Sequence, residues 1–501
     1  MVQRWVGIGA VCVFMVGGAL LMARGQGGIP PVYVTLWFDT EDYILPQSDD
    51  AALRLAEILT RLGVKGTFKV VGEKARVLER RGRADVIRAL QKHEIGYHSN
   101  FHSRQPTVAG YLQNAGWEDG AAEFLRREGP GALDVQRIFG TPPVCYGQPG
   151  SSWAPQAHRA LRELGIRTYL DESRHVGLGA QPFYYGGLLN IINLGGFVTR
   201  LDLDGAGNLD RAKGGFRKAA EGLRARGGGT ISVYYHPCEF VHGEFWDALN
   251  FGGGKNPPPA EWRLPRTKPA EEAEKGFKDF EAYVRFIRSE PGVSFKTVAE
   301  LEEIYADRSA GRSFSSAEIR EIAASVRNEI TFLRSGGVWL SSSDVFSLLT
   351  ETMENFLERN LAPVEATYNY LDGPARPFVP SKGGVAPAEI PWPAFASAVR
   401  DVASYCRDRR RVPDEVWIGA ASLSPADFLA TVAVAVEEVL KSGSAPAAVP
   451  RREGKATAER FVAKDAPSLW GWVIFPEGFR SPAIMEQARL QAWTLKPAVL
   501  H

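Results

Sequence analysis

The sequence predicts an α/β protein, with a distorted parallel (β/α) barrel followed by a mainly α-helical C-terminal domain. From Pro31 to Arg308, short apolar runs alternate with amphipathic stretches at helical spacing, a pattern typical of repeated βα units. Seven or eight such units favour a barrel. An open doubly wound sheet is the rival, but no Gly-x-Gly-x-x-Gly turn follows the first expected strand, so a dinucleotide-binding version has little support.

The expected elements follow from these periodicities. The strands are residues 32–38, 66–71, 95–98, 144–147, 167–170, 188–194, 230–235 and 293–295, and the helices among them are residues 49–62, 83–92, 155–164, 209–226 and 271–289. Beyond residue 308 the pattern becomes helical, with segments at 316–333 and 343–359 and further helices after a Pro-rich linker at 373–393. The barrel is therefore expected over 29–308 and the helical domain over 309–501.

The first 28 residues have the character of an export segment. Arg4 precedes an apolar run at 5–22, and a glycine-rich stretch follows at 25–28. This order predicts a signal peptide or a single N-terminal membrane anchor over 1–28. The protein is accordingly expected to be exported: periplasmic, associated with the cell envelope, or secreted.

Composition and charge exclude several classes of protein. The 501 residues include 59 Lys and Arg against 58 Asp and Glu, a formal net charge of +1, and 45% are hydrophobic. No basic excess is present to hold nucleic acid, and the apolar content excludes a disordered chain. Four cysteines are too few to be the main support of a fold this long.

Three carboxylates in four residues close the first expected strand, at Asp39, Glu41 and Asp42. Like charges crowded at a strand end repel one another unless a cation lies among them, so the cluster predicts a metal site. The alternative is a solvated acidic turn. The preceding apolar strand favours the metal, because barrel enzymes keep their sites at this end of the strands.

Three histidines end other expected strands. His98 and His102 are four residues apart, a spacing that puts both rings on one face of a helical turn and suits two ligands of a zinc-like ion. With a carboxylate they make a site with open positions for water and substrate. His236 ends a late strand and suits a general acid if a carboxylate holds its other nitrogen. Asp171, Asp202 and Asp204 are all candidates for that carboxylate.

The order of these motifs, with a Pro- and Gly-rich loop at 146–153, resembles the polysaccharide deacetylases with a NodB homology domain over about residues 31–308. The resemblance implies that Asp39 is the catalytic base and His236 the catalytic acid. It also implies that His98 and His102 bind one divalent metal ion, with zinc expected. Thr40 stands where the family has its metal carboxylate, so Glu41, which shares a face with Asp39, is the expected third ligand and Asp42 the fallback.

The loop at 146–153 departs from the family. Gln148 stands where the family has an arginine that orients the base. A neutral amide can hydrogen-bond Asp39 but cannot favour its charged form as a guanidinium does. Tyr146, Gln148 and Trp153 are expected to contact substrate, and the two aromatic residues, together with Tyr234 and Trp246, to stack on sugar faces.

The implied function is an exported, metal-dependent hydrolase that removes acetyl groups from N-acetylated amino sugars of an envelope polysaccharide or peptidoglycan. Two alternatives remain open at this point: a non-catalytic glycan-binding protein on the same barrel, and a metal-dependent amidase acting on a small non-sugar amide.

The helical domain has a resemblance of its own. Residues 412–429 look like the helical wall-binding repeats of the pseudomurein type, and the stretches 338–349 and 421–432 look alike. They are either a degenerate repeat or two helices that share N-capping signals.

Overall fold

The computed structural model describes residues 28–327, 329–359 and 370–501. Within these residues, ten strands form one sheet. They are β1 (Val32–Thr40), β2 (Thr67–Val70), β3 (Glu94–Tyr97), β4 (Cys145–Tyr146), β5 (Thr168–Leu170), β6 (Phe183–Tyr185), β7 (Leu188–Ile191), β8 (Gly229–Tyr235), β9 (Val293–Phe295) and β16 (Lys496–Pro497).

The sheet confirms the expected fold class. Its order is β16-β6-β7-β5-β4-β3-β2-β1-β8, with β9 also paired to β1. Every pairing is parallel from β8 through β5 to β7, and β6 and β16 add antiparallel strands at one edge. The result is a distorted (β/α) barrel, a curled sheet whose parallel strands all end at one rim. The sequence pattern had not indicated β6 or β16.

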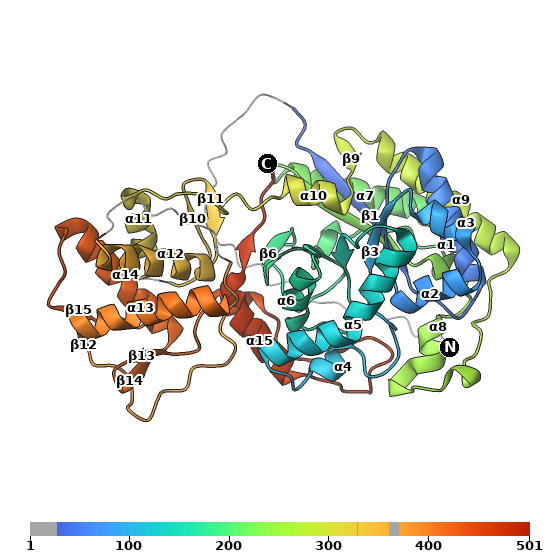
Figure 1. Cartoon of the computed structure of the whole chain (residues 1–501). Coiled ribbons are helices and arrows are strands. Elements are labelled where there is room, and N and C mark those ends of the chain that lie inside the picture. The colour runs from blue at the N-terminus through green and yellow to red at the C-terminus, as the bar shows by residue number, and fades with distance from the viewer. Residues whose placement is uncertain (1–27, 328, 360–369) are drawn as a thin grey trace.

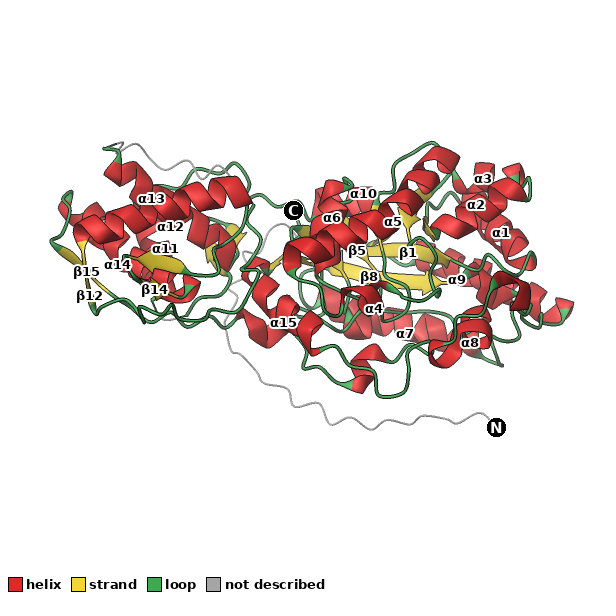
Figure 2. Ribbon diagram, turned by 60° about the horizontal axis from the view of Figure 1, so that its bottom comes forward, coloured by secondary structure: helices red, strands yellow, loops and turns green. Residues whose placement is uncertain are grey.

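Helices surround this sheet (Figure 2). They are α1 (Gln47–Leu62), α2 (Gly72–Arg80), α3 (Ala84–Leu90), α4 (Val108–Leu112), α5 (Trp117–Phe139), α6 (Gln156–Glu163), α7 (Asn208–Arg224), α8 (Trp246–Phe251), α9 (Ala270–Ser289) and α10 (Val298–Ile304). The five expected helices are confirmed as α1, α3, α6, α7 and α9, with shifted ends.

Alternation along β1 decides which residues reach the barrel interior. Phe38 faces the helices, where its ring lies 4.6 Å from that of Phe68 and 6.0 Å from that of Phe280 on α9. Trp37 faces the interior, and its ring stacks on Tyr234 of β8 at 4.7 Å. Asp39 shares the face of Trp37, so the strand delivers its carboxylate to the interior near the rim.

Residues 314–449 form the core of a second, mainly helical part, shown at the left of Figure 1. The order helix, hairpin, helix occurs twice. The first set is α11 (Ser316–Val326), β10 (Leu333–Ser335), β11 (Val338–Leu340) and α12 (Ser342–Leu357), and the second is α13 (Trp392–Arg409), β13 (Val416–Ile418), β14 (Ala421–Leu423) and α14 (Pro425–Ser442).

Both similar stretches of sequence are therefore a strand followed by a capped helix. Ser341 and Ser424 are the N-caps, and each accepts a hydrogen bond from the backbone N–H of an Asp three residues on. The helix expected at 316–333 ends at Val326 because the first hairpin begins at Leu333. Strands β12 (Glu389–Pro391) and β15 (Ala448–Pro450) pair across the second unit, β12 at the end of the expected linker 373–393.

The last segment of the chain packs against the barrel. Residues from Ala458 to Ala498 belong to the barrel's hydrophobic core, and β16 pairs with β6. Figure 1 shows α15 (Pro482–Gln491) beside the barrel. The division expected at residue 308 stays a prediction, but the segment that it assigns to the helical domain contacts both the barrel and, through Trp493 and Lys496, the helical part.

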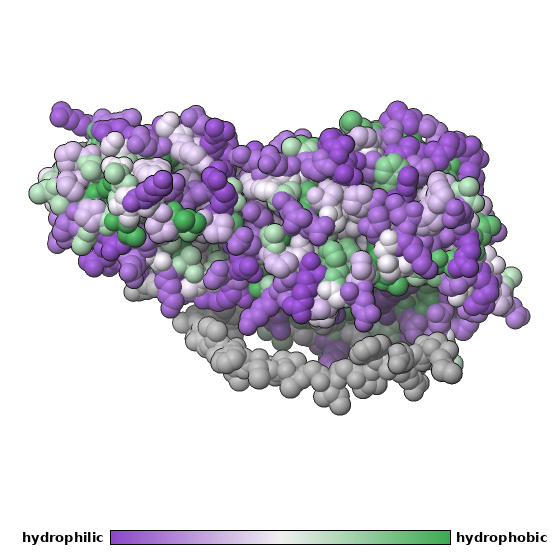
Figure 3. Space-filling view, turned by 90° about the horizontal axis from the view of Figure 1, so that it is seen from below, coloured by the Kyte–Doolittle hydropathy of each residue, from purple (hydrophilic) through white to green (hydrophobic). Residues whose placement is uncertain are grey.

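The expected signal peptide or anchor at 1–28 lies, except for residue 28, outside the described residues. Among the helices that the structure describes, none has both the length and the apolar character needed to cross a bilayer. Apolar residues appear in small groups among hydrophilic ones on the face shown in Figure 3.

Candidate metal centre and active site

The ends of β1 and β3 bring Glu41, His98 and His102 together. The Glu41 Oε2 atom lies 2.8 Å from His102 Nε2 and 3.5 Å from His98 Nε2. One potential ligand atom from each of the three lies within 4.8 Å of the others, and none of these residues is more than 4% exposed. Parallel neighbouring strands ending at one rim explain this convergence.

His98 and His102 are brought to the site by a backbone conformation that differs from the expected helical turn. Residues 98–102 do not form a helical turn; Ser99 and His102 instead adopt left-handed backbone angles, with φ of 66° and 55°. Non-glycine residues rarely adopt this conformation, and it occurs preferentially at functional sites. The turn folds the chain back so that His102 faces Glu41.

Hydrogen bonds around the three side chains aim them at a common point. His98 donates from Nδ1 to the Gly147 carbonyl at 3.0 Å, and His102 Nδ1 is hydrogen-bonded to Ser103 Oγ at 2.7 Å. Trp246 donates from Nε1 to Glu41 Oε1 at 2.9 Å. Both histidines are thereby left with Nε2 facing Glu41, the orientation that second-shell contacts give to metal ligands. The donor set fits a divalent ion such as zinc.

Charge and burial act in opposite directions on these groups. Burial alone would raise the pKa of Glu41, but His102 and His236 outweigh it and hold that pKa well below its usual value. Burial lowers the pKa of His98. Burial would lower the pKa of His102 as well, but the Glu41 carboxylate raises it. A buried carboxylate surrounded by imidazoles is suited to a cation.

Asp42, the fallback ligand, does not join this group. Its Oδ1 atom accepts hydrogen bonds from the N–H groups of Ile44 and Leu45 at 2.8 and 3.0 Å, and its Oδ2 atom lies 2.7 Å from His242 Nε2. Its Oδ1 atom is thus used by the turn after β1, and its Oδ2 atom by His242. Of the two carboxylates considered, Glu41 is the one beside the histidines.

Asp39 lies between the three candidate ligands and His236. Its Oδ1 atom is 3.4 Å from His98 Nδ1, and its Oδ2 atom is 3.6 Å from His236 Nε2. Asp39, His98 and Asp171 form a second group of potential ligand atoms within 4.8 Å of one another. The candidate base and the candidate acid are therefore neighbours.

The carboxylate that holds His236 is Glu239, which the sequence reasoning missed. Glu239 Oε1 contacts His236 Nδ1 and accepts the His236 backbone N–H at 3.1 Å, while its other oxygen pairs with Arg200. The three aspartates considered lie elsewhere: Asp171 pairs with Lys69, Asp204 with Lys268, and Asp202 accepts the N–H of Asp204. The available signal was local, a His-x-x-Glu spacing across a 3-10 turn.

This arrangement affects the protonation of His236. Burial opposes its charged form, but Glu41 and Glu239 outweigh burial and raise the pKa of His236 to about 9. The Arg200 and His236 cations in turn outweigh burial and lower the pKa of Glu239 to about 2. The histidine is therefore protonated at neutral pH, as a general acid must be.

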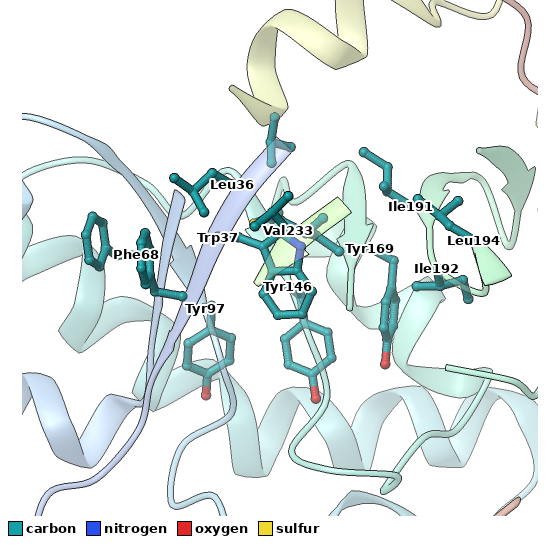
Figure 4. Packing of buried hydrophobic residues seen from close by; sticks show 14 of the residues in the cluster. Leu36, Trp37, Phe68, Tyr97, Tyr146, Tyr169, Ile191, Ile192, Leu194 and Val233 are labelled. Carbon is teal, nitrogen blue, oxygen red and sulfur yellow. The ribbon is translucent and has the colours of Figure 1, made fainter. Parts of the chain in front are cut away.

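The residues of the 146–153 loop that were expected to contact substrate are buried. Tyr146 and Trp153 are fully buried, and Figure 4 shows Tyr146 in a row of rings between Tyr97 and Tyr169. Trp153 stacks on His175 at 4.8 Å. Trp246, also fully buried, holds Glu41, and only Tyr234 is half-buried. Tyr146, Trp153 and Trp246 therefore pack inside the fold, where they contact other protein groups.

Gln148 is buried and faces Asp171, not a cleft. Its Nε2 atom donates to Asp171 Oδ1 at 3.2 Å. The same aspartate accepts a hydrogen bond from Lys69, a residue of β2 that also pairs with Asp39. No sequence motif indicates Lys69, because it is a single charged residue within a short buried strand.

A residue from the last segment of the chain also reaches the site. The Trp472 ring lies 5.2 Å from that of His102, and its Nε1 atom donates to Asp247 Oδ2 at 2.8 Å. Its backbone N–H donates to Ser151 Oγ at 3.1 Å. The distance in sequence, more than 300 residues from His102, explains why no local pattern indicated it.

No family model and no curated protein matches the sequence. Several solved structures are similar to it. A protein of Mycobacterium smegmatis named a polysaccharide deacetylase has 18% identity and a TM-score of 0.36, over 56% of this chain and 91% of its own.

Two carbohydrate esterases of family 4 are similar at lower scores. An acetyl xylan esterase of Clostridium thermocellum, solved with a cobalt ion, has 15% identity and a TM-score of 0.29, over 55% of this chain and 91% of its own. An esterase of Streptomyces lividans, solved with acetate, has 14% identity and a TM-score of 0.29, over 54% and 94%. These similarities are too distant to assign an activity.

Proposed function

We propose that this protein is an exported, metal-dependent hydrolase that removes acetyl groups from N-acetylated amino sugars of an envelope polysaccharide or peptidoglycan. One observation carries the proposal. A carboxylate, Asp39, lies between a buried Glu41, His98 and His102 cluster on one side and a carboxylate-held histidine, His236, on the other. Amide hydrolysis requires a metal or equivalent electrophile, a base and an acid in this relation.

The roles follow from position and charge. Glu41, His98 and His102 hold the ion, with zinc the expected metal. When bound, a divalent ion polarises the acetyl carbonyl and lowers the pKa of water. Asp39 takes the proton of the attacking water, because it is the carboxylate next to the ligand cluster. His236, kept protonated by Glu239, gives a proton to the departing amine.

Acetate release tests the function directly. Purified protein is incubated with N-acetylglucosamine oligomers and with peptidoglycan, after chelation and after return of zinc, cobalt or manganese. We expect acetate release that chelation removes and a divalent ion restores, and an Asp39→Asn variant that keeps its metal but releases no acetate. Absence of release with every ion on every glycan, from folded wild-type protein, would reject the proposal.

Burial of the site favours one alternative, a metal-dependent amidase acting on a small non-sugar amide. Asp39, Glu41, His98 and His102 are each at most 4% exposed, so a small substrate reaches them more easily than an internal unit of a polymer. Rates measured on monomeric amides and on glycan polymers separate the two. A non-catalytic glycan-binding protein would bind the polymer without releasing acetate.

The helical part is proposed to hold the enzyme on its polymer, as its resemblance to wall-binding repeats suggests. Trp417 on β13 is 50% exposed and available for stacking on a sugar. Tethering of this kind raises the local concentration of substrate. Sedimentation with insoluble peptidoglycan tests it: Trp417→Ala is expected to weaken co-sedimentation without changing the rate on soluble oligomers.

A further inference from the structure

Lys69 is a fully buried lysine at the centre of the site. Its ammonium group has three oxygen partners: Asp39 Oδ1 at 2.9 Å, Asp171 Oδ2 at 2.6 Å and the Leu170 carbonyl at 2.9 Å. The ammonium group donates hydrogen bonds to Asp171 and to the Leu170 carbonyl, and it forms an ion pair with Asp39. A lysine buried in this way has a fixed position, and it fixes the carboxylates that it touches.

The barrel is built to accommodate this side chain. Asp39, Lys69 and Gly96 are partners in register across β1, β2 and β3. A Cβ atom on Gly96 would lie 2.9 Å from Lys69 Cγ, and one on Gly147 would lie 2.1 Å from Lys69 Nζ and 2.2 Å from Asp171 Oδ2. Both positions therefore need glycine, because a Cβ atom at either would overlap the Lys69 side chain. The Trp37 ring covers the ammonium group at 4.0 Å, a cation–π contact.

Gln148 cannot supply this charge. Its amide is neutral, and of the two Asp171 oxygens it contacts Oδ1, at 3.2 Å, whereas Lys69 contacts Oδ2. Asp39 is not among its hydrogen-bond partners, which are Asp171 and the carbonyls of Gly150 and Glu172. Among the described residues, the cation that touches Asp39 through a short ion pair is Lys69.

We propose that Lys69 is the positioning residue for the base Asp39, and that it provides from β2 the positive charge that the 146–153 loop lacks. The inference rests on the proposed function. Lys69 holds the Oδ1 atom of Asp39, so the Oδ2 atom faces His236. The substrate amide must lie on this side, between the base and the acid. Asp171, which itself accepts a hydrogen bond from Gln148, in turn holds Lys69.

A purely structural ion pair is the competing explanation, and the chain offers a matched control for it. Lys496 is also buried, at 2% exposed, and also bridges two aspartates, Asp307 at 2.6 Å and Asp344 at 2.8 Å. It lies on β16, at the opposite edge of the sheet. Like Lys69→Met, Lys496→Met removes a buried ammonium group from between two aspartates, but it does so far from Asp39.

The test compares kcat, KM and metal content of Lys69→Met, Lys496→Met and wild-type protein. We expect Lys69→Met to keep its metal and its KM and to lose about 100-fold in kcat, the size expected when one preorganised charge is removed. Lys496→Met should lower the melting temperature and leave kcat unchanged. Lys69→Met with kcat within twofold of wild type, or a loss of kcat that only follows loss of metal, would overturn the inference.

A second pair of variants covers a failure to fold. Lys69→Met/Asp171→Asn keeps the buried net charge at its original value, because it removes one cation and one anion together. It should fold, bind metal and show the same loss of kcat. Adding Gln148→Arg returns a cation to the site from the loop and should recover at least tenfold. No recovery by a folded, metal-loaded triple variant would also count against a positioning role.

The two possible failures are distinguishable. Wild-type protein that binds metal but releases no acetate rejects the proposed function, and this inference with it. Active wild-type protein together with a fully active Lys69→Met rejects the inference alone.

Discussion

At the scale of single residues, the chemistry depends on which charges are paired with which. His236 is buried beside two carboxylates, and its pKa is raised to about 9 because Glu41 and Glu239 outweigh the effect of burial. Glu239 is itself held by Arg200. Arg200, Glu239 and His236 therefore form a chain of paired charges that ends at the candidate acid.

The raised pKa of His236 gives a pH prediction with a definite sign. A general acid works only when protonated, so kcat should be constant at neutral pH and fall as the pH rises through about 9. Glu239→Gln removes one of the carboxylates that raise the pKa and should move this decline to lower pH. Profiles of kcat against pH for both proteins provide the measurement, and an unmoved decline would contradict the assignment of His236.

Metal binding and proton transfer should separate by mutation. His98→Ala removes a ligand and should abolish metal retention, whereas His236→Ala should keep the metal and lose turnover by about 100-fold or more. Metal analysis of the two purified variants, alongside acetate release, checks both. Loss of metal from His236→Ala would show that the two histidines have been given the wrong roles.

At the scale of elements, strand register positions the site. The pairing of Asp39 with Lys69 and of Lys69 with Gly96 aligns the residues that meet inside the barrel. Gly147, just after β4, faces Lys69 and Asp171 so closely that any side chain would collide with them. The glycines are thus part of the site, although they carry no chemistry.

Gly147→Ala should therefore be damaging. The added methyl group would overlap Lys69 Nζ and Asp171 Oδ2, and overpacking of this kind costs about 1–3 kcal/mol of stability. We expect a lower melting temperature and at least a tenfold loss of kcat. Gly214→Ala on α7, where a Cβ would meet nothing within 4 Å, is the control and should be neutral or stabilising. Equal behaviour of the two variants would argue against close packing at Gly147.

At the scale of the whole molecule, the barrel is formed by the strands from β1 to β9 together with the last segment of the chain. The segment from Ala458 onward packs into the barrel core and adds β16 to the sheet beside β6. It also places Trp472 next to His102. The helical part is inserted between β9 and this returning segment. The C-terminal segment therefore contributes both to stability and to the wall of the site.

Removal of residues 458–501 should leave a barrel that does not fold stably. It would take away more than five buried apolar side chains, among them Trp470, Phe475, Ile484, Met485 and Leu495. Each contributes about 1.5–3 kcal/mol, so their sum is comparable with the whole stability of a domain, about 5–15 kcal/mol. A truncated chain with an unchanged melting temperature and near-ultraviolet circular dichroism would contradict this.

Sequence patterns predicted much of the barrel, because its strands are apolar and its helices amphipathic. They did not indicate α5, which runs through Gly129, Pro130 and Gly131. Gly131 lets this helix approach Tyr97 closely, since a Cβ there would lie 2.5 Å from the Tyr97 hydroxyl. The short hairpins of the helical part have too few residues to produce an alternating pattern.

In the site, motifs at strand ends indicated Asp39, Glu41, His98, His102 and His236, and the structure brings these five together. Glu239 was missed although a local His-x-x-Glu spacing was available, and the other two residues missed share a different property. Lys69 and Trp472 have no motif, and they matter only because the fold brings them to the site. Tyr146 and Trp153, predicted as substrate contacts, are fully buried, and sequence alone does not distinguish a core aromatic residue from an exposed one.

Metal content of purified Glu41→Gln and Asp42→Asn variants tests the central claim most directly, since both carboxylates follow the same strand and only Glu41 lies beside the histidines. Wild-type protein and Asp42→Asn should each bind one divalent ion per chain, and Glu41→Gln should bind none or bind it at least tenfold more weakly. An ion kept by Glu41→Gln with unchanged affinity, or lost from a folded Asp42→Asn, would contradict a centre built from Glu41, His98 and His102.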